Sequence, residues 1–456
     1  MVLILMDFDR KIVAFTSLLL LSVMFSFGQG KFELPGKQKA KIRFELINNL
    51  IVLPVEINGV KLSFMLDTGV SKPILFNITN TDSLQMNNVE TIFLRGLGGG
   101  ETVKALRSKN NFIKIGNAIN INQEIYVVFD QEINFTPKLG VPVHGIIGYD
   151  FFKDFIVEID YKSKNIKLNK REGYTYKSCK KCENFNLSFH NNKPYIEGEV
   201  ILGEKAIPVK LLIDTGSSDA LWLFEDDSHG ISAKNNNYFH DFLGRGLSGN
   251  VHGKRSKISA FKLKSFTLKN VNAAFPDSSS IKFAKRIEDR NGSLSAEILR
   301  RFNIIFDYEK ATIRLKKNSN FKDKFNYNRS GIILEQHGLR LVKEAVQKKT
   351  LDNYGRSNDD NTTISTVETY SVGLKPAYTI IEVRENSPAD NVGLLKGDVI
   401  VSINGKQAHE LKLQEVIHYF RGKVGKMVRL KVERGNQILS VEFRLEDVFK
   451  KKELPN

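Results

Sequence analysis

The sequence predicts a mainly β protein in which one β-rich domain occurs twice and a smaller α+β domain follows. Two Asp-Thr-Gly segments begin at Asp67 and Asp214, 147 residues apart. Two longer similar segments end at Asp160 and Asp307, at the same separation. Short runs of alternating apolar and polar residues fill both copies, which is typical of half-buried strands. The chain has 456 residues, enough for about three domains.

Residues 1–28 have the features of a secretory signal peptide. Arg10 and Lys11 precede an uncharged run, and small residues follow at Ser26 and Gly28. An uncleaved membrane anchor is the alternative, but the run is shorter than the roughly 20 residues that a spanning helix needs. We therefore expect a cleaved signal and an exported protein.

Each copy is expected to contain the same strands and one short helix. In the first copy two alternating runs flank Asn58-Gly59, a dipeptide typical of a tight hairpin turn. The short helices are expected around residues 149–155 and 296–302. The two copies extend over residues 40–170 and 190–317.

Residues 171–189 link the copies and contain both cysteines of the chain, Cys179 and Cys182. A C-x-x-C pair can be a redox pair or half of a zinc site. No second Cys pair or nearby His pair accompanies it, and export would expose it to an oxidising compartment. We therefore expect a short structural disulfide, no metal site and no cofactor.

The formal net charge of +17 is spread along the chain rather than clustered. Lysines alternate with apolar residues, as expected for the solvated faces of half-buried strands. The sequence has no nucleic-acid-binding motif, so we expect no nucleic-acid partner.

The two Asp-Thr-Gly segments contain the candidate catalytic residues, the aspartates. Glycine in such a turn lets main-chain amides approach the carboxylate. Two carboxylates held close together share one proton, so that one acts as general base on water and the other as general acid. A single Asp-Thr-Gly would favour an ordinary turn. Its recurrence after an apolar strand in both copies favours catalysis by Asp67 and Asp214.

On these residues the chain resembles the retropepsin-like aspartic peptidases, with two lobes fused in tandem as in pepsin. It is most similar to bacterial versions with a C-terminal PDZ domain. The resemblance implies two acid-protease β-barrel lobes, endopeptidase activity on proteins or peptides, and a monomer, because both lobes are in one chain. It also implies the periplasm or outer envelope of a Gram-negative bacterium, or secretion. The residues implied to support the dyad are Thr68, Gly69, Thr215, Gly216 and Ser217, and the two threonines are expected to hydrogen-bond between the turns.

Two positions depart from the family pattern. Val70 stands where Ser, Thr or Ala is usual, whereas Ser217 fits and can hydrogen-bond the outer oxygen of Asp214. Asp67 should therefore hold the shared proton more often, because fewer hydrogen bonds stabilise its ionised form. Ser295 replaces the glycine found at Gly148 in the first copy. These departures leave open an alternative, a catalytically silent peptide-binding scaffold on a peptidase fold.

Both copies also carry Arg-Gly-Leu in a glycine-rich stretch, at residues 95–97 and 245–247. Residues 244–249 match the G-x-G-x-x-G pattern, but no βαβ unit surrounds them, so nucleotide binding is not expected. The stretches resemble retropepsin flaps, which close over substrate. Pepsin-type enzymes keep one flap with a Tyr, which neither stretch has, so we expect two flaps. The predicted flap residues are Gly96, Leu97, Gly246 and Leu247.

Residues 328–447 resemble a bacterial PDZ domain, an α+β fold with a partly open barrel. Ser387-Pro388 begins a short helix, and residues 411–420 have helical apolar spacing suited to one wall of a peptide groove. By resemblance, Gly331, Ile332, Ile333 and Leu334 form the loop whose amides hold the carboxylate of a C-terminal peptide tail. Residues 345–366 are expected to be a mobile insertion. The alternative is a domain that only packs against the peptidase.

Overall fold

The computed structural model describes residues 30–78, 84–130, 133–234, 237–287, 289–351 and 364–449. The predicted signal peptide, residues 1–28, lies outside these ranges. Within them, no helix combines the length and apolar character needed to cross a membrane.

The two copies form two eight-stranded sheets with the same strand order. In sheet order the first lobe has β2 (Glu45–Ile47), β3 (Leu50–Ile57), β4 (Val60–Leu66), β9 (Gly145–Ile147), β5 (Ile74–Leu75), β8 (Ala118–Val128), β7 (Val103–Ile115) and β6 (Val89–Leu94). The second lobe has β13 (Ser188–His190), β14 (Lys193–Leu202), β15 (Lys205–Asp214), β20 (Arg290–Ser295), β16 (Leu221–Leu223), β19 (Phe266–Pro276), β18 (Gly249–Leu263) and β17 (Tyr238–Gly246). Further pairing of β3 with β7 and of β14 with β18 curls each sheet onto itself. The duplication predicted from the sequence is thus a duplication of the fold.

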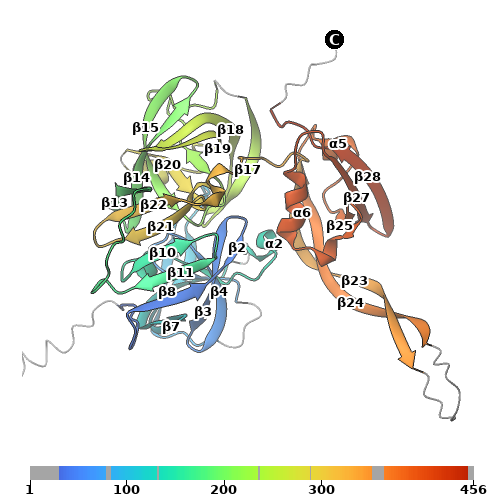
Figure 1. The fold of residues 1–456 in the computed structure, drawn as a ribbon, viewed down its shortest axis with the longest axis horizontal. Helices are drawn as coiled ribbons and strands as arrows, with labels where there is room; N and C mark the ends of the chain where they lie inside the picture. The colour runs from blue at the N-terminus through green and yellow to red at the C-terminus, as the bar shows by residue number, and fades with distance from the viewer. Residues whose placement is uncertain are drawn as a thin grey trace, which may run out of the picture.

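A third sheet joins the lobes (Figure 1). Its order is β1 (Lys39–Arg43), β11 (Asn165–Asn169), β10 (Ile156–Asp160), β21 (Phe302–Asp307), β22 (Thr312–Lys317) and β12 (Cys182–Asn186). At its centre β10 runs antiparallel to β21, with Ile159 opposite Ile304, and both side chains are buried. These strands are the repeated segments that end in Asp160 and Asp307, so the repeat also supplies the interface between the lobes.

Local chemistry explains the turns and short helices. Asn58 and Gly59 both have positive φ, 47° and 88°, as the hairpin turn between β3 and β4 requires. The helices α3 (Tyr149–Phe152) and α4 (Ala296–Leu299) are shorter than predicted. An unpredicted helix, α2 (Thr136–Leu139), ends at Gly140, whose φ is 66°. The 3-10 helices are η1 (Ala284–Arg286), η2 (Ser319–Lys322) and η3 (Ala408–Glu410).

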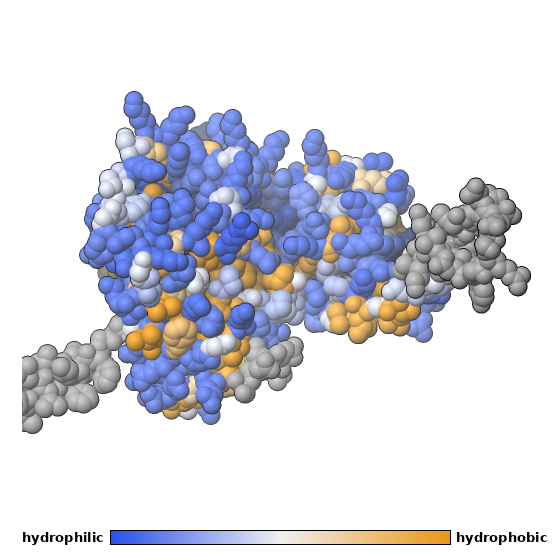
Figure 2. All heavy atoms as spheres, turned by 60° about the horizontal axis from the view of Figure 1, so that its bottom comes forward, coloured by the Kyte–Doolittle hydropathy of each residue, from blue (hydrophilic) through white to orange (hydrophobic). Residues whose placement is uncertain are grey.

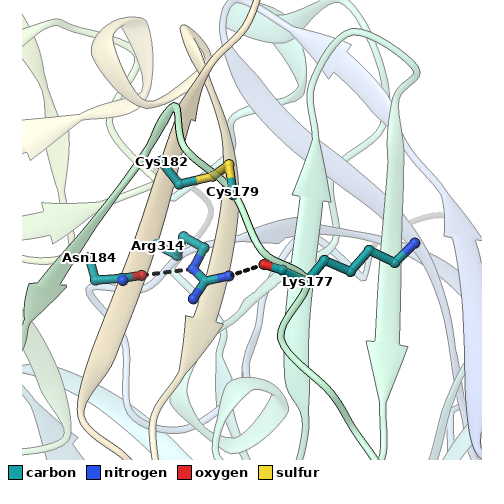
Figure 3. The surroundings of a disulfide bond; sticks show 5 residues. All are labelled: Lys177, Cys179, Cys182, Asn184 and Arg314. Carbon is teal, nitrogen blue, oxygen red and sulfur yellow. Dashed lines mark hydrogen bonds between the residues drawn. A yellow bond between two sulfur atoms is a disulfide. The ribbon is translucent and has the colours of Figure 1, made fainter.

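Cys179 and Cys182 form the expected disulfide in the segment between the lobes (Figure 3). Beside it, the Arg314 guanidinium on β22 donates to the Lys177 carbonyl at 3.0 Å and to Asn184 Oδ1 at 2.7 Å. The linking segment is therefore fastened to the sheet that joins the lobes.

The C-terminal domain has a sheet of its own. It contains β23 (Ile332–Leu351), β24 (Ile364–Val383), β25 (Val399–Ile403), β26 (Lys406–Gln407), β27 (Met427–Arg434) and β28 (Gln437–Arg444), with helices α5 (Pro388–Asn391) and α6 (Leu413–Phe420). Ser387 caps α5 by accepting a hydrogen bond from the Asp390 amide, as predicted. Asn404 and Gly405, with φ of 49° and 84°, form the turn after β25.

The predicted insertion at residues 345–366 needs correction. Residues 345–351 continue β23, and residues 364–366 begin β24, with Leu351 opposite Ile364. The β-branched residues Val346, Thr350, Ile364 and Thr366 in these two stretches favour strand over loop. Residues 352–363 lie outside the described ranges.

The C-terminal domain lies beside both lobes, and α2 lies between the first lobe and this domain (Figure 1). The Tyr327 hydroxyl donates to the carbonyls of Ser256 and Ala273 in the second lobe, at 2.7 and 3.2 Å. On the first-lobe side, Gln414 of α6 donates to the Leu139 carbonyl of α2. Hydrophobic residues gather on the surface where the three units meet (Figure 2).

Candidate active site

The two Asp-Thr-Gly turns meet in a cavity of about 370 Å³ between the lobes. Asp67 follows β4, which runs parallel to β9, and its amide donates to the Ile147 carbonyl at 2.8 Å. Asp214 ends β15, which runs parallel to β20, with Asp214 opposite Ser295. Both carboxylates line the cavity. The same strand arrangement, used twice, brings them together.

Four hydrogen bonds lock the two turns to each other. The Thr68 amide donates to Thr215 Oγ1 at 3.0 Å, and the Thr215 amide donates to Thr68 Oγ1 at 3.1 Å. The hydroxyls in turn donate across to carbonyls of the other lobe, Thr68 to Ile213 at 2.6 Å and Thr215 to Leu66 at 2.8 Å. Both threonines are buried. This reciprocal pattern is the one that the resemblance implied.

The turn glycines donate amide hydrogen bonds to the carboxylates, and because they lack a side chain they leave space for the carboxylates. Gly69 donates to Asp67 Oδ1 at 2.7 Å, and Gly216 donates to Asp214 Oδ1 at 3.0 Å. Each glycine also faces the opposite carboxylate. A Cβ at Gly216 would lie 2.3 Å from Asp67 Cγ, and one at Gly69 would lie 3.8 Å from Asp214 Oδ1. Any larger residue at Gly216 would therefore push the two carboxylates apart.

The environment raises the pKa of both acids, but unequally. Burial, followed by the charge of Asp214, raises the pKa of Asp67 to about 7, while the Gly69 amide and Lys193 lower it. Burial also raises the pKa of Asp214. This rise is opposed by Arg290, by the amides of Gly216 and Ser217, and by Lys193. Asp67 therefore holds the shared proton more readily, as expected.

The reason for this asymmetry differs in part from the prediction. Ser217 stabilises the Asp214 carboxylate through its backbone amide, not through the hydroxyl that we expected. The other departure, Ser295, leaves the turn intact. Ala296 donates to the Ser217 carbonyl at 2.9 Å, just as Tyr149 donates to the Val70 carbonyl at 2.9 Å in the first lobe.

Both predicted flaps lie over this cavity, and their tips bind each other. The Gly96 amide donates to Ser248 Oγ at 3.0 Å, and the Ser248 amide donates to the Leu97 carbonyl at 2.9 Å. A Cβ at Gly246 would lie 2.2 Å from the Leu97 carbonyl oxygen, and one at Gly96 would lie 2.7 Å from Leu247 Cβ. These glycines are needed because the two tips cross at close range.

Each flap leucine packs on the opposite lobe. Leu97 of the first lobe contacts the second-lobe cluster that contains Trp222 and Leu243. Leu247 of the second lobe contacts the cluster that contains Ile47 and Met65 of the first. Both leucines line the cavity. The flaps are therefore related by the pseudo-twofold symmetry that the sequence repeat predicted.

Comparison with protein families agrees with this geometry. The aspartyl protease family model matches residues 53–151 and again residues 197–296, and the PDZ domain model matches residues 357–445. The chain therefore has two tandem protease-like lobes followed by a C-terminal PDZ domain. No curated protein matches it. The PDZ match begins within the segment between β23 and β24, although β23 belongs to the same sheet.

The predicted carboxylate loop of the PDZ domain is only partly a loop. Gly331, with φ of 87°, precedes the strand, but Ile332, Ile333 and Leu334 already pair with β24. The Ile332 amide donates to Ser330 Oγ at 3.0 Å, so this amide already has a partner within the domain. The structure thus places three of the four predicted residues in β23, which forms one wall of the groove between β23 and α6.

The groove between β23 and α6 faces the protease domains. A cavity of about 180 Å³ is lined by Ile332, Ile333 and Ile417 of the PDZ domain and by Phe239 and Phe242 of the second lobe. Four residues line both this cavity and the one around the dyad, namely Asn48, Lys138, Ser218 and Leu243. The PDZ groove and the dyad cavity are therefore neighbours.

Sequence analysis missed two basic residues beside the dyad. Lys193 begins β14 and Arg290 begins β20, and both line the dyad cavity. Nothing in the repeat indicated them, because their place near Asp214 depends on how β14 and β20 pack. Within the described residues, no group of three or more His, Cys, Asp or Glu side chains is placed to hold a metal ion.

Proposed function

We propose that this chain is an aspartic endopeptidase that uses Asp67 and Asp214 to hydrolyse the peptide bonds of its substrates. The observation that carries the proposal is the locked pair of Asp-Thr-Gly turns, which holds both carboxylates in one cavity under two crossed flaps. A scaffold that only bound peptides would not need two carboxylates with raised pKa values at its centre.

The reaction follows from the unequal acids. In the state with one shared proton, Asp214 is the better base because Arg290, Lys193 and two amides stabilise its ionised form. It takes a proton from a water that attacks the peptide carbonyl, while protonated Asp67 donates to the carbonyl oxygen. The diol intermediate then collapses as the amine leaves with a proton from the dyad. Crossed flaps exclude bulk water during these steps.

The proposal is tested with Asp67→Asn and Asp214→Asn, assayed on a mixed peptide library. Each should lower kcat/KM by at least about 100-fold, because one carboxyl cannot serve as both base and acid. Asp227→Asn is the matched control, since Asp227 is exposed and its ion pair among the described residues is with Lys234. A folded Asp67→Asn or Asp214→Asn protein that still cleaves would contradict the dyad. A wild-type protein that binds peptides but cleaves none would favour the silent scaffold.

We further propose that the PDZ domain binds C-terminal tails of protein substrates and delivers them to the neighbouring cleft. The shared lining of the two cavities supports this. Tail peptides with a free carboxylate should compete with protein substrates, whereas the same peptides with a C-terminal amide should not. Equal competition by both forms would contradict the proposal.

We also propose that the protein is exported and that it is monomeric. Cell fractionation tests the export, and analytical ultracentrifugation tests the monomeric state.

A further inference from the structure

The dyad cavity is strongly basic among the described residues. Its lining contains six cationic side chains and only two carboxylates, which are those of the dyad. The cations are Lys72, Arg95, Lys138, Lys193, Arg245 and Arg290. An extended peptide bound here would pass through a field that favours negative charge.

Two of these cations, Lys193 and Arg290, have dyad carboxylates among their charged neighbours. Lys72 pairs with Asp150 at 3.2 Å, and Lys138 is near Asp219 and Asp241. Lys193, in contrast, has Arg290, Asp67 and Asp214 as its charged neighbours. A dyad that shares one proton carries a single negative charge. Lys193 and Arg290 together therefore carry one positive charge more than the dyad balances.

Arg290 is held rigidly beside the dyad. Its guanidinium lies 5.2 Å from the centre of the Phe224 ring and 5.9 Å from that of Tyr195. Nε donates to the Gly292 carbonyl at 3.2 Å, and Nη2 donates to Ser293 Oγ at 3.1 Å. A fixed, buried guanidinium of this kind is suited to bind a carboxylate.

The duplicated first lobe provides an internal comparison. Lys193 and Leu50 each begin the strand that pairs with the Asp-bearing strand, and Arg290 and Val143 each lie two residues before the glycine that opens the repeated segment. Leu50 and Val143 are apolar and buried. The fold therefore does not require cations at these positions, and the basic pair is a property of one side of the cleft.

We propose that Lys193 and Arg290 form a subsite that binds the side-chain carboxylate of an Asp or Glu residue close to the scissile bond. This inference rests on the proposed endopeptidase function and gives it a substrate class, acidic peptides. The added anion neutralises the excess positive charge, and the residues on the Leu50 side contact apolar substrate side chains.

The test is a comparison of cleavage sites in a mixed peptide library, followed by matched peptides that differ only by Glu or Gln. Sites cut by the wild-type protein should be enriched in Asp or Glu within two residues of the scissile bond. The Glu peptide should be cleaved with a kcat/KM about 10-fold to 100-fold above that of the Gln peptide, as expected for a charge-assisted hydrogen bond. Lys193→Gln and Arg290→Gln should each reduce this ratio to near one, whereas Lys193→Arg should keep it.

Lys72→Gln is the matched control, because it removes a cavity cation that already has a carboxylate partner. It should leave the Glu-to-Gln ratio unchanged. Arg290→Gln can fail to fold, since Arg290 lies over two aromatic rings, and Lys193→Gln then carries the test. Cleavage without acidic enrichment would overturn the subsite but not the endopeptidase. If the protein cleaves nothing, statine-type peptides with Glu or Gln still decide the matter, and equal binding of the two would overturn it.

Discussion

At the scale of single residues, the surroundings of Asp67 and Asp214 have diverged although both Asp-Thr-Gly motifs are intact. Gly69 and Gly216 are required by close contacts with a carboxylate, so a sequence motif can report them. Lys193 and Arg290 are set by the packing of β14 and β20, and no local pattern marks them. The sequence therefore predicted which acids meet but not which cations surround them.

Ser295 offers a test at this scale. It stands where the first copy has Gly148, and its buried hydroxyl has no hydrogen-bond partner among the described residues. Ser295→Ala removes a polar atom that gains nothing in the folded state, so it should raise the free energy of unfolding by about 1 kcal/mol. Thermal unfolding measures this. Ser259→Ala, on an exposed residue, should change little, and a destabilised Ser295→Ala would show that the hydroxyl has a partner.

At the scale of elements, local signals predicted turns well and long-range contacts poorly. Asn58-Gly59 and Asn404-Gly405 form the expected turns because their backbone preferences are local. The strand extension of residues 345–351 was missed because the segment as a whole is rich in Asn, Asp and Lys, although Leu351 pairs with Ile364. The flaps were predicted from their repeat, but the crossing of their tips depends on the placement of both lobes.

The crossed tips predict the effect of Gly246→Val. A side chain there would collide with the Leu97 carbonyl oxygen, so the tips should separate and kcat/KM should fall by about 10-fold or more, as for a misplaced substrate-positioning group. Gly373→Val is a suitable control, because the nearest atom to a Cβ there is 3.9 Å away on a flexible lysine. Wild-type activity in a folded Gly246→Val protein would show that the second flap does not cover substrate.

At the scale of the whole molecule, α2 connects the cleft to the PDZ domain. Leu139 lines the dyad cavity, and its carbonyl accepts a hydrogen bond from Gln414 of the PDZ helix. The sequence predicted both domains but not α2, a four-residue helix too short to give a periodic pattern. The contact explains why the PDZ groove faces the lobes.

This contact can be broken from the first lobe. A Cβ at Gly140 would lie 2.9 Å from Leu413 Cβ, so Gly140→Val should loosen the PDZ domain and increase the radius of gyration in small-angle X-ray scattering. Gly203→Val is a matched control. Gly203 has a similar positive φ of 63°, so the backbone strain is comparable, but no atom lies within 4 Å of its Cβ position. Equal scattering from both variants would contradict the role of α2.

The pH dependence of peptide cleavage tests the dyad most directly. Catalysis needs one proton on the pair, and the pKa of Asp67 is raised to about 7. As the pH rises through this value the proton is lost, so kcat/KM should be high in weak acid, fall to about half near pH 7 and decline about tenfold per pH unit above it. A profile that rises from pH 7 to pH 9 would contradict the account, because it would require a base with no need for the shared proton.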